Sequence, residues 1–296
     1  MPFVCRCEPA LHARPRRMAL PYGTLPQGSK LWLLDLGDLS IDEGEVLSGS
    51  TVFPVSAPPV KHKRRELIMI SALVLHPKRG LILYDTGTCE DVLTSWGSAA
   101  LECMPRYWNK EKHSLPAAIA ATGNDIKDVK IVVISHLHSD HAGGLEHFID
   151  TDVEVWVHED ELKTAFWSAA TGVDTMFNKD YLLIGGRLNW KTFSSEVFTL
   201  LPGITLHRCA GHTEGLVIFH LTLPAAGDVI FTADMFHVPE NYYQGVPQGT
   251  LMRNFYAWKR SRSYIMTLVN NLEARVCFGH DKVCFSNFPL SPAYLE

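Results

Sequence analysis

Long apolar runs are missing from this 296-residue sequence, and so is any regular pairing of cysteines. No run approaches the length needed to cross a bilayer, and residues 1–28 carry arginines without the apolar stretch of a secretory signal. The seven cysteines are odd in number and scattered, which is not typical of a disulfide framework. We therefore expect a cytosolic protein that has no membrane partner and whose thiols are buried or without a role.

Excess positive charge is also missing, because 27 Lys and Arg residues face 32 Asp and Glu residues, for a net charge of -5. The only basic clusters lie at residues 14–17 and 61–65, and we interpret both as solvated loop or arm. Such a protein has no field that attracts a polyanion, so we expect no nucleic-acid partner. With 46% apolar and 20% charged residues, the composition is typical of a soluble globular protein, and it leaves the number of subunits open.

Five prolines and no periodic apolar pattern characterise residues 1–28, which we interpret as an N-terminal arm that is partly disordered. We assign residues 29–296 to a single α/β domain. Three strands that form an antiparallel meander are predicted at residues 30–36, 68–75 and 80–84. The long loop at 49–63 is a candidate flap over the functional site, because loops of this length in a compact domain are usually functional.

Strands and helices alternate after the meander, which predicts an α/β fold. The predicted helices cover residues 91–102, 115–121, 159–168 and 263–273. The predicted strands cover residues 129–134, 153–157, 197–200, 204–209, 217–223, 229–233 and 274–278. Residues 169–195 show no clear period, and we predict a mobile cap segment there.

Three histidines and an aspartate lie within six residues directly after the apolar run 131–134. Imidazole and carboxylate together suit zinc and other borderline-soft divalent metals. The apolar run predicts a buried strand, and Gly143-Gly144 lets the backbone turn into the segment that follows. The sequence therefore predicts a metal site at the C-terminal end of a strand, with the candidate ligands His136, His138, Asp140 and His141.

Three later residues share this context, because each follows an apolar strand. They are His212, Asp234 and His280. If the strand ends share one surface, the seven side chains supply five imidazoles and two carboxylates, which is enough for two metal ions. A single histidine would by default be structural, but an ordered set of this kind favours metal binding.

Other residues that could carry chemistry lack the strand-end context. We interpret four histidines as structural or exposed, namely His147, His158, His207 and His220. Cys209 is predicted to be a small core residue and Asp281 a turn residue. Four aromatic residues are predicted to lie in the core rather than in a pocket wall: Phe53, Trp167, Phe177 and Trp190.

The chain resembles the metallo-β-lactamase superfamily, and most closely its branch of N-acyl homoserine lactone lactonases. The resemblance spans roughly residues 30 to 285 and rests on His-Leu-His-Ser-Asp-His at 136–141, Gly143-Gly144, Gly-His-Thr at 211–213, Asp85-Thr86-Gly87, Asp234 and His280. It implies a four-layer αββα sandwich in a single domain. These motifs are specific for the fold and for metal binding but not for the substrate.

The resemblance also implies a role for each ligand. His136, His138 and His212 would bind one metal, Asp140, His141 and His280 the other, and Asp234 would bridge the two. Two Zn²⁺ ions per subunit are expected, with other divalent metals possible, and a hydroxide between them would be the nucleophile. Asp140 would pass a proton to the leaving group. We expect Asp85 and backbone carbonyls to orient the imidazoles through their second nitrogen.

One position departs from the lactonase pattern. Lactonases of this branch carry a tyrosine three residues after the bridging aspartate, and here that position is His237. We hypothesise that His237 donates a hydrogen bond to the substrate oxygen, with Tyr242 or Tyr243 as the alternative donor.

The leading hypothesis is a dimetal hydrolase that opens a small cyclic ester or amide, namely a lactone, a γ-lactam or a cyclic carbamate. The alternative is an N-acyl homoserine lactone lactonase in the strict sense. A thioesterase of the glyoxalase II kind is disfavoured because only 16 residues follow His280. A non-catalytic metal-bound scaffold is disfavoured because binding alone would not require two open metal positions.

Overall fold

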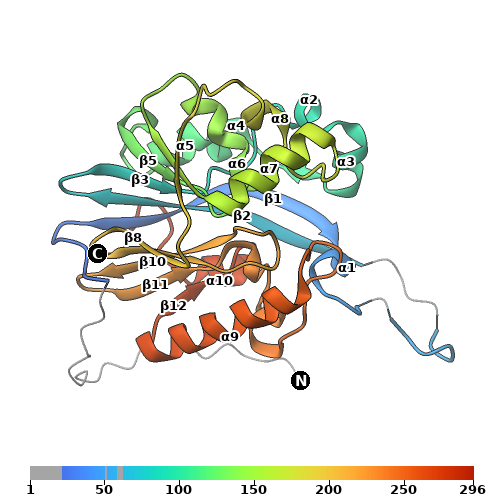
Figure 1. Ribbon diagram of the computed structural model, residues 1–296. Coiled ribbons are helices and arrows are strands. Elements are labelled where there is room, and N and C mark those ends of the chain that lie inside the picture. The colour runs from blue at the N-terminus through green and yellow to red at the C-terminus, as the bar shows by residue number, and fades with distance from the viewer. Residues whose placement is uncertain (1–21, 51, 59–62) are drawn as a thin grey trace.

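Two β-sheets lie face to face between two layers of helices, as Figure 1 shows. The computed structural model describes residues 22–50, 52–58 and 63–296. The helices from α2 to α8 lie over one sheet and α9 lies along the outer face of the other (Figure 1). This arrangement confirms the predicted α/β sandwich of four layers.

The first sheet has seven strands and contains the predicted meander. In spatial order they are β4 (Arg106–Tyr107), β1 (Lys30–Asp42), β2 (Arg64–His76), β3 (Gly80–Tyr84), β5 (Val129–Val133), β6 (Glu154–His158) and β7 (Asn189–Phe193). The pairs β1·β2 and β2·β3 are antiparallel, whereas β3, β5, β6 and β7 run parallel. The loops that follow β3 and β5 therefore leave the sheet at the same edge.

The second sheet has five strands. In spatial order they are β12 (Arg275–Cys277), β11 (Gly227–Phe231), β10 (Val217–Leu223), β9 (Ile204–Arg208) and β8 (Val197–Leu201). Only β11 and β12 are parallel, and the other neighbours are antiparallel. Because β9, β11 and β12 run in the same direction, the loops that follow them also meet at one edge.

Most helices are short. Those over the first sheet are α2 (Val92–Trp96), α3 (Ser98–Cys103), α4 (Lys110–His113), α5 (Leu115–Ala120), α6 (Ser139–Ala142), α7 (Glu159–Thr171) and α8 (Lys179–Leu182). The others are α1 (Glu43–Val46), α9 (Phe255–Leu272) and α10 (Lys282–Ser286). The described residues also contain four short 3₁₀ or π segments: η1 (Ile126–Asp128), η2 (Gly143–Phe148), η3 (Ala233–Met235) and the π-helical η4 (Glu240–Gln244). Within the described ranges, no helix has the length and apolarity to cross a membrane.

Alternation along the strands separates three apolar cores. In β5, Ile131 and Val133 point between the sheets, whereas Val132 points toward the helices of the first layer. In β10, Phe219 lies between the sheets and Ile218 lies under α9. Because strands buried on both faces carry apolar residues at every position, these segments read as continuous apolar runs in the sequence.

The first strand is longer than predicted. The prediction ended this strand at residue 36, before Gly37, but β1 continues to Asp42 through a β-bulge between Asp35 and Asp38. Gly37 has φ +96° there, and its N–H donates to the Asp35 carboxylate at 3.0 Å. A residue without Cβ takes up the irregular geometry, so pairing with β2 resumes beyond it.

Two helix predictions had wrong boundaries. The helix predicted at 91–102 is interrupted at Gly97, whose φ of +80° separates α2 from α3. The helix predicted at 263–273 begins eight residues earlier, where the Asn254 side chain accepts a hydrogen bond from the Ala257 N–H and caps α9. Aromatic residues at the start of α9 are exposed, so the apolar residues there do not follow the periodic pattern of a helix with one buried face.

The predicted cap at 169–195 was also wrong in part. It contains α8 and the edge strand β7, whose mostly half-exposed residues give no clean alternation. Phe177 is buried as predicted, but Trp167 is 59% exposed and Phe53 is 49% exposed, so neither belongs to the core. Phe53 lies in the described part of the loop proposed as a flap, which projects from the edge of the molecule (Figure 1).

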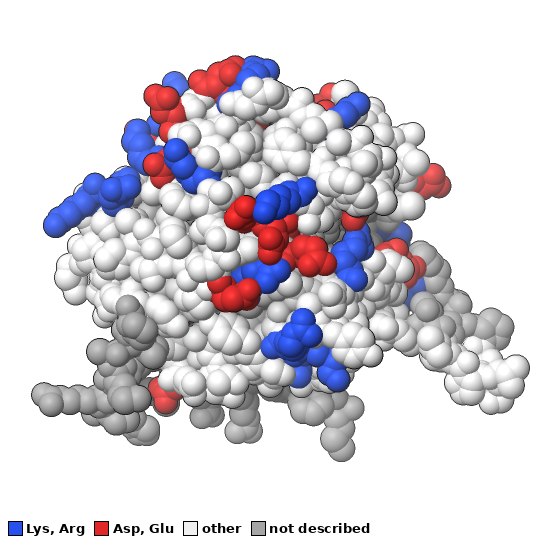
Figure 2. Space-filling view, viewed as in Figure 1, with Lys and Arg blue, Asp and Glu red and all other residues white. Residues whose placement is uncertain are grey.

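Residues 1–21 of the proposed N-terminal arm lie outside the described residues. The remainder contacts the second sheet, where the Leu25 N–H donates to the Thr222 carbonyl at 2.9 Å and the Leu25 side chain is buried. On the face drawn in Figure 2, acidic and basic side chains lie interspersed and most of the surface carries neither. That face therefore presents no extended field of one sign.

Candidate metal centre

The histidine-rich segment leaves β5 and bends sharply into α6. His138 has the extended backbone of a helix N-cap, and α6 carries Asp140 and His141. The two glycines that follow are required by close packing, because a Cβ at Gly143 would lie 2.2 Å from the Cys89 nitrogen. Glycine at this point therefore lets the ligand segment lie directly against the loop that follows β3.

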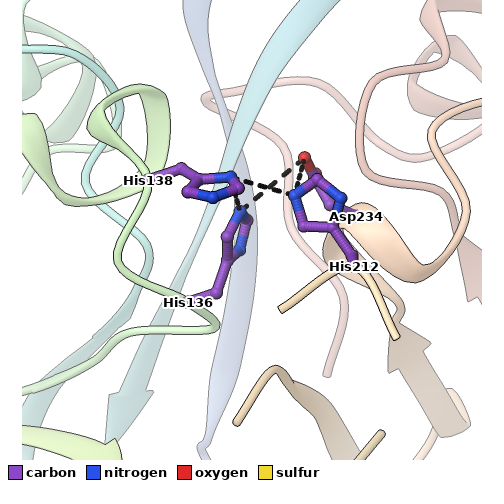
Figure 3. A group of neighbouring side chains, drawn as sticks. All are labelled: His136, His138, His212 and Asp234. Carbon is purple, nitrogen blue, oxygen red and sulfur yellow. Dashed lines mark hydrogen bonds and ion pairs between the residues drawn. The ribbon is translucent and has the colours of Figure 1, made fainter. Parts of the chain in front are cut away.

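The second sheet supplies the other three candidate ligands. His212 follows β9, Asp234 lies in the turn η3 after β11, and His280 follows β12. Figure 3 shows His136 and His138 on one side, and His212 and Asp234 on the other, with their side chains pointing toward one another. The structure brings all seven sequence-predicted ligands together, and all seven are buried.

Four of these side chains form what we call the first group: His136, His138, His212 and Asp234. Their ligand atoms all lie within 4.8 Å of one another. His138 Nδ1 is 3.1 Å from His136 Nε2 and 3.0 Å from His212 Nε2, while His212 Nε2 is 3.3 Å from Asp234 Oδ2. The donors therefore surround one small volume, as a metal site requires.

The second group consists of Asp140, His141, His280 and again Asp234, with the ligand atoms within 4.8 Å of one another. His141 Nε2 and His280 Nε2 are 3.2 Å apart, and each lies close to Asp234 Oδ1, at 3.1 and 2.9 Å. One oxygen of Asp234 thus faces each group. A single carboxylate shared in this way is suited to bridge two cations.

Hydrogen bonds fix the protons of four imidazoles on the nitrogen that faces away from the groups. The partners at Nδ1 are the Asp85 carboxylate for His141 (2.8 Å), the Ile68 carbonyl for His280 (2.9 Å), Gln248 Oε1 for His212 (3.1 Å) and Ser135 Oγ for His136 (3.0 Å). The Ser135 hydroxyl donates its own proton to Asp85, so it accepts from His136.

Each of these partners accepts a hydrogen bond, so the proton of the neutral ring is at Nδ1 and the lone pair at Nε2 points inward. Lone pairs that converge at about 3 Å repel one another unless a cation lies between them. The donor set therefore fits two divalent metal ions, with imidazole and carboxylate as ligands.

The electrostatics agree with uncharged imidazoles in the first group. Burial, with the neighbouring histidines, holds the pKa of His136 and His138 far below the usual value, and burial lowers the pKa of His212 to about 3. Burial opposes ionisation of Asp234, but His237, His141 and His280 together bring its pKa well below the usual value. Burial opposes protonation of His141 and His280, but the charge of Asp234 raises the pKa of both above the usual value, so the protons that they share with Asp234 are those that a bound cation would displace. A permanent negative charge is therefore placed between the two groups.

Gln248 was not identified from the sequence. Its amide oxygen contacts His212, and its amide nitrogen donates to the carbonyl of Asp234, so one buried side chain orients a ligand and the turn that carries another. Gln248 lies in an irregular loop between η4 and α9, and no motif or strand end marks it. Asp85, by contrast, was expected to orient a ligand and contacts His141 in this way.

His237 lies beside the metal groups, with Nε2 at 3.0 Å from Asp234 Oδ2. Nδ1 of His237 is buried and has no hydrogen-bond partner among the described residues. Of the alternative donors, Tyr242 is buried against Phe236 and Phe278, and Tyr243 is 65% exposed. Only Nδ1 of His237 is therefore a free polar atom next to the centre among these candidates.

Two histidines outside the groups form a separate buried network in the second sheet. His207 Nε2 lies 3.3 Å from His220 Nδ1, and His220 Nε2 lies 3.0 Å from Asp228 Oδ1. His207 Nδ1 also lies 2.7 Å from the Tyr264 hydroxyl. Both histidines are buried and satisfied by protein groups, as the sequence interpretation expected.

Comparison with known proteins adds a family and a set of relatives. A family model described as the metallo-beta-lactamase superfamily matches residues 65–280. The N-acyl homoserine lactonase AiiB of Agrobacterium fabrum is 27% identical over 271 residues, which is 88% of this chain and 96% of that protein. The N-acyl homoserine lactonase AttM of Azorhizobium caulinodans is 29% identical over 236 residues, or 76% of this chain and 86% of the relative.

The fold also matches solved structures. An N-acyl homoserine lactone hydrolase with the product N-hexanoyl-L-homoserine bound at its catalytic metal centre superimposes with a TM-score of 0.74 at 23% identity. The match covers 90% of this chain and 98% of that one. AidC, a dizinc quorum-quenching lactonase in complex with a product, superimposes with a TM-score of 0.60 at 16% identity over 88% of this chain and 89% of that one. At these identities the likeness establishes the fold.

Proposed function

Because the chain belongs to the metallo-β-lactamase superfamily and is a metal-dependent hydrolase of that kind, we propose that it opens a small cyclic ester or cyclic amide. The observation that carries the proposal is the pair of buried ligand groups that share Asp234. Two adjoining metal positions suit hydrolysis, because one can activate water while the other polarises a carbonyl.

We assign His136, His138 and His212 to one ion and Asp140, His141 and His280 to the other, with Asp234 shared. Zn²⁺ is the proposed metal for both positions, since the donors are imidazoles and carboxylates, and other divalent metals remain compatible with this set. When bound, the two cations would supply Lewis acidity and an activated water. The remaining chemistry belongs to side chains of this chain.

Asp140 is the proposed proton donor to the leaving group. Its Oδ2 faces His141 and His280 at 3.7 Å, whereas Oδ1 is buried and has no hydrogen-bond partner among the described residues. A carboxyl oxygen without another hydrogen-bond partner can hold and deliver a proton. The nitrogen of a ring amide needs such a proton when it leaves, and the oxygen of a ring ester hardly does.

His237 is the proposed contact to the substrate. Its Nε2 is occupied by Asp234, so the contact must use Nδ1. If the Nε2 proton bonds to Asp234, Nδ1 of the neutral ring accepts a hydrogen bond and suits a substrate N–H. Only a ring protonated on both nitrogens would keep the bond from Nε2 to Asp234 and also donate from Nδ1 to a substrate oxygen, as the sequence hypothesis requires.

The second candidate function is N-acyl homoserine lactone hydrolysis in the strict sense. It is favoured by the relatives, several of which are named N-acyl homoserine lactonases. The histidine at position 237, where the branch carries tyrosine, speaks for a different ring substrate.

The test combines metal analysis of the purified protein with a hydrolysis panel of acyl homoserine lactones, simple lactones, γ-lactams, cyclic carbamates and glutathione thioesters. We expect two metal ions per chain and turnover of at least one ring class. Activity on thioesters alone, or two bound metals without any turnover, would refute the proposal. His237→Phe is the variant that tests the substrate contact, and an unchanged rate would refute that role.

A further inference from the structure

Glu161 lies where the two ligand loops of the first group meet. One loop carries Leu137 between His136 and His138, and the other continues from His212 to Gly215. Glu161 belongs to the first turn of α7, and none of its surface is exposed. Its carboxylate Oε1 accepts the Leu137 N–H at 2.8 Å, and Oε2 accepts the Gly215 N–H at 3.0 Å.

We propose that Glu161 is a positioning residue that sets the distance between the His136–His138 pair and His212, and thereby the metal affinity of the first group. This inference rests on the dimetal function proposed above. The two loops come from different sheets, and the carboxylate connects them at Leu137, between two ligands, and at Gly215, three residues after His212. A second link, from the Val217 N–H to the Ser135 carbonyl at 2.8 Å, lies farther from His212.

Close packing supports this role. A Cβ at Gly215 would lie 2.3 Å from the Glu161 nitrogen, so the loop after His212 rests directly on the first turn of α7. The carbonyl of Leu137 is also held, because it accepts a hydrogen bond from the Tyr181 hydroxyl at 2.8 Å. The backbone N–H and the backbone carbonyl of Leu137, the residue between the two histidines, are therefore both fixed from the side of the helices.

The charge of Glu161 has no other evident use. Among the described residues it forms no ion pair with a basic side chain, and a fully buried carboxylate without such a partner is costly to maintain. Its carboxylate accepts from the backbone N–H of Leu137, which neighbours two ligands, and from that of Gly215, three residues after His212. Burial raises the pKa of Glu161 to about 7, and these two N–H groups and the Thr213 hydroxyl oppose the rise. A carboxylate can accept from both sides at once, which neutral side chains of the same shape cannot do.

The informative variant is Glu161→Gln. An amide accepts on one side only, so its NH₂ group must face one of the two backbone N–H donors and push that loop away. We expect the first group to lose metal affinity by about 10- to 100-fold, the usual effect of removing a group that orients ligands. The second group shares only Asp234 with the first and should keep its affinity.

The experiment is a titration of metal-depleted protein with Co²⁺, followed by visible absorption and by the stoichiometry of bound cobalt. The parent protein should bind two ions, and Glu161→Gln should bind one at the concentration that fills both sites of the parent. Glu159→Gln is the matched control, because Glu159 is in the same helix turn but is partly exposed and pairs with Lys163 at 2.7 Å. It removes the same charge and should bind cobalt like the parent.

Glu161→Asp covers the case in which the glutamine variant does not fold. It keeps the charge but is one methylene shorter, so it cannot reach both loops, and the first group should again be the one that weakens. Parent-like binding of two ions by a folded Glu161 variant, or equal weakening of both groups, would overturn the inference. If the parent itself binds fewer than two ions, the dimetal function fails instead, so the two failures are distinguishable.

Discussion

Replacing Asp85 by asparagine tests whether a proton position controls metal binding. Asp85 Oδ1 accepts the Ser135 backbone N–H at 2.7 Å, and Oδ2 accepts from the Ser135 hydroxyl at 2.7 Å and from His141 Nδ1 at 2.8 Å. The asparagine oxygen must stay opposite the backbone N–H, which can only donate. The NH₂ group then faces His141, so the proton of that ring moves to Nε2 and the lone pair that a metal needs is lost.

The backbone conformation at residue 85 accepts asparagine without strain. Asp85 has φ +58°, in the left-handed region that asparagine tolerates as well as aspartate does. The change therefore removes a charge and reverses one hydrogen bond without straining the chain. A hydrogen bond to a charged group contributes about 1.5 to 3 kcal/mol. Loss of a partner that orients a metal ligand weakens binding by about 10- to 100-fold, which corresponds to about 1.4 to 2.7 kcal/mol.

The assay is competition between the protein and a chelator for Zn²⁺, with the stoichiometry read at each chelator concentration. The Asp85→Asn variant should release the ion of the second group at a chelator concentration about 10- to 100-fold lower than the parent does. Asp281→Asn is the control: Asp281 neighbours His280 in the chain but caps α10 by accepting the Cys284 N–H at 2.6 Å, which asparagine can also do. Equal affinity in the Asp85 variant and the parent, or loss from the first group instead, would refute the reasoning.

Two further predictions concern the fold. Gly143→Ala should lower the free energy of unfolding by about 1 to 3 kcal/mol or more, because its Cβ would lie 2.2 Å from the backbone nitrogen of Cys89; urea denaturation measures this, and an unchanged midpoint would contradict it. Burial, with His220 nearby, lowers the pKa of His207 from 6.5 to about 3, so between these values the unfolded chain binds the proton and the folded chain does not. Stability should therefore fall as the pH drops below about 6.5, by up to about 1.4 kcal/mol per pH unit from this group. His207→Gln should flatten that dependence in urea melts between about pH 6.5 and pH 5, and parallel curves for variant and parent would count against it.

The sequence predicted the seven clustered side chains because each lies in the segment that follows a strand. A strand end is visible as the boundary of an apolar run, and the strands of a sandwich bring such boundaries to one edge. The ligand segment at 136–141 is also continuous, so its members lie close together in any fold. The strand ends and the continuous ligand segment can therefore be recognised without knowledge of the packing.

Residues that act through long-range contacts could not be predicted in this way. Gln248 reaches His212 from an irregular loop 36 residues away in the chain, and nothing in its neighbourhood marks it. Glu161 follows two other acidic residues at the start of α7, where negative charge is common because it complements the helix dipole. Only the fold distinguishes Glu161, which is fully buried, from Glu159, which is partly exposed.

The errors in the predicted secondary structure also come from contacts between segments that are distant in the sequence. Gly37 and Gly97 look alike in the sequence, yet one lies in a bulge within β1 and the other separates α2 from α3. A glycine can lie in a bulge within a strand only if the residues after it pair again with a neighbouring strand. The edge strand β7 was not predicted for the same reason, because the local sequence pattern does not indicate that it pairs with β6.

The position of Asp234 in the sequence also determines how much of the chain is needed before a complete ligand group is present. Both ligand groups include this residue, so no segment that ends before position 234 contains a complete group, although four of the seven ligands are already present by residue 141. The second group must wait still longer, for His280. Contacts that close such long loops reduce the conformational entropy of the chain, and this cost arises before the ligands come together. Each complete group therefore draws ligands from both sheets, and the first group is complete in the chain at Asp234, before the second is complete at His280.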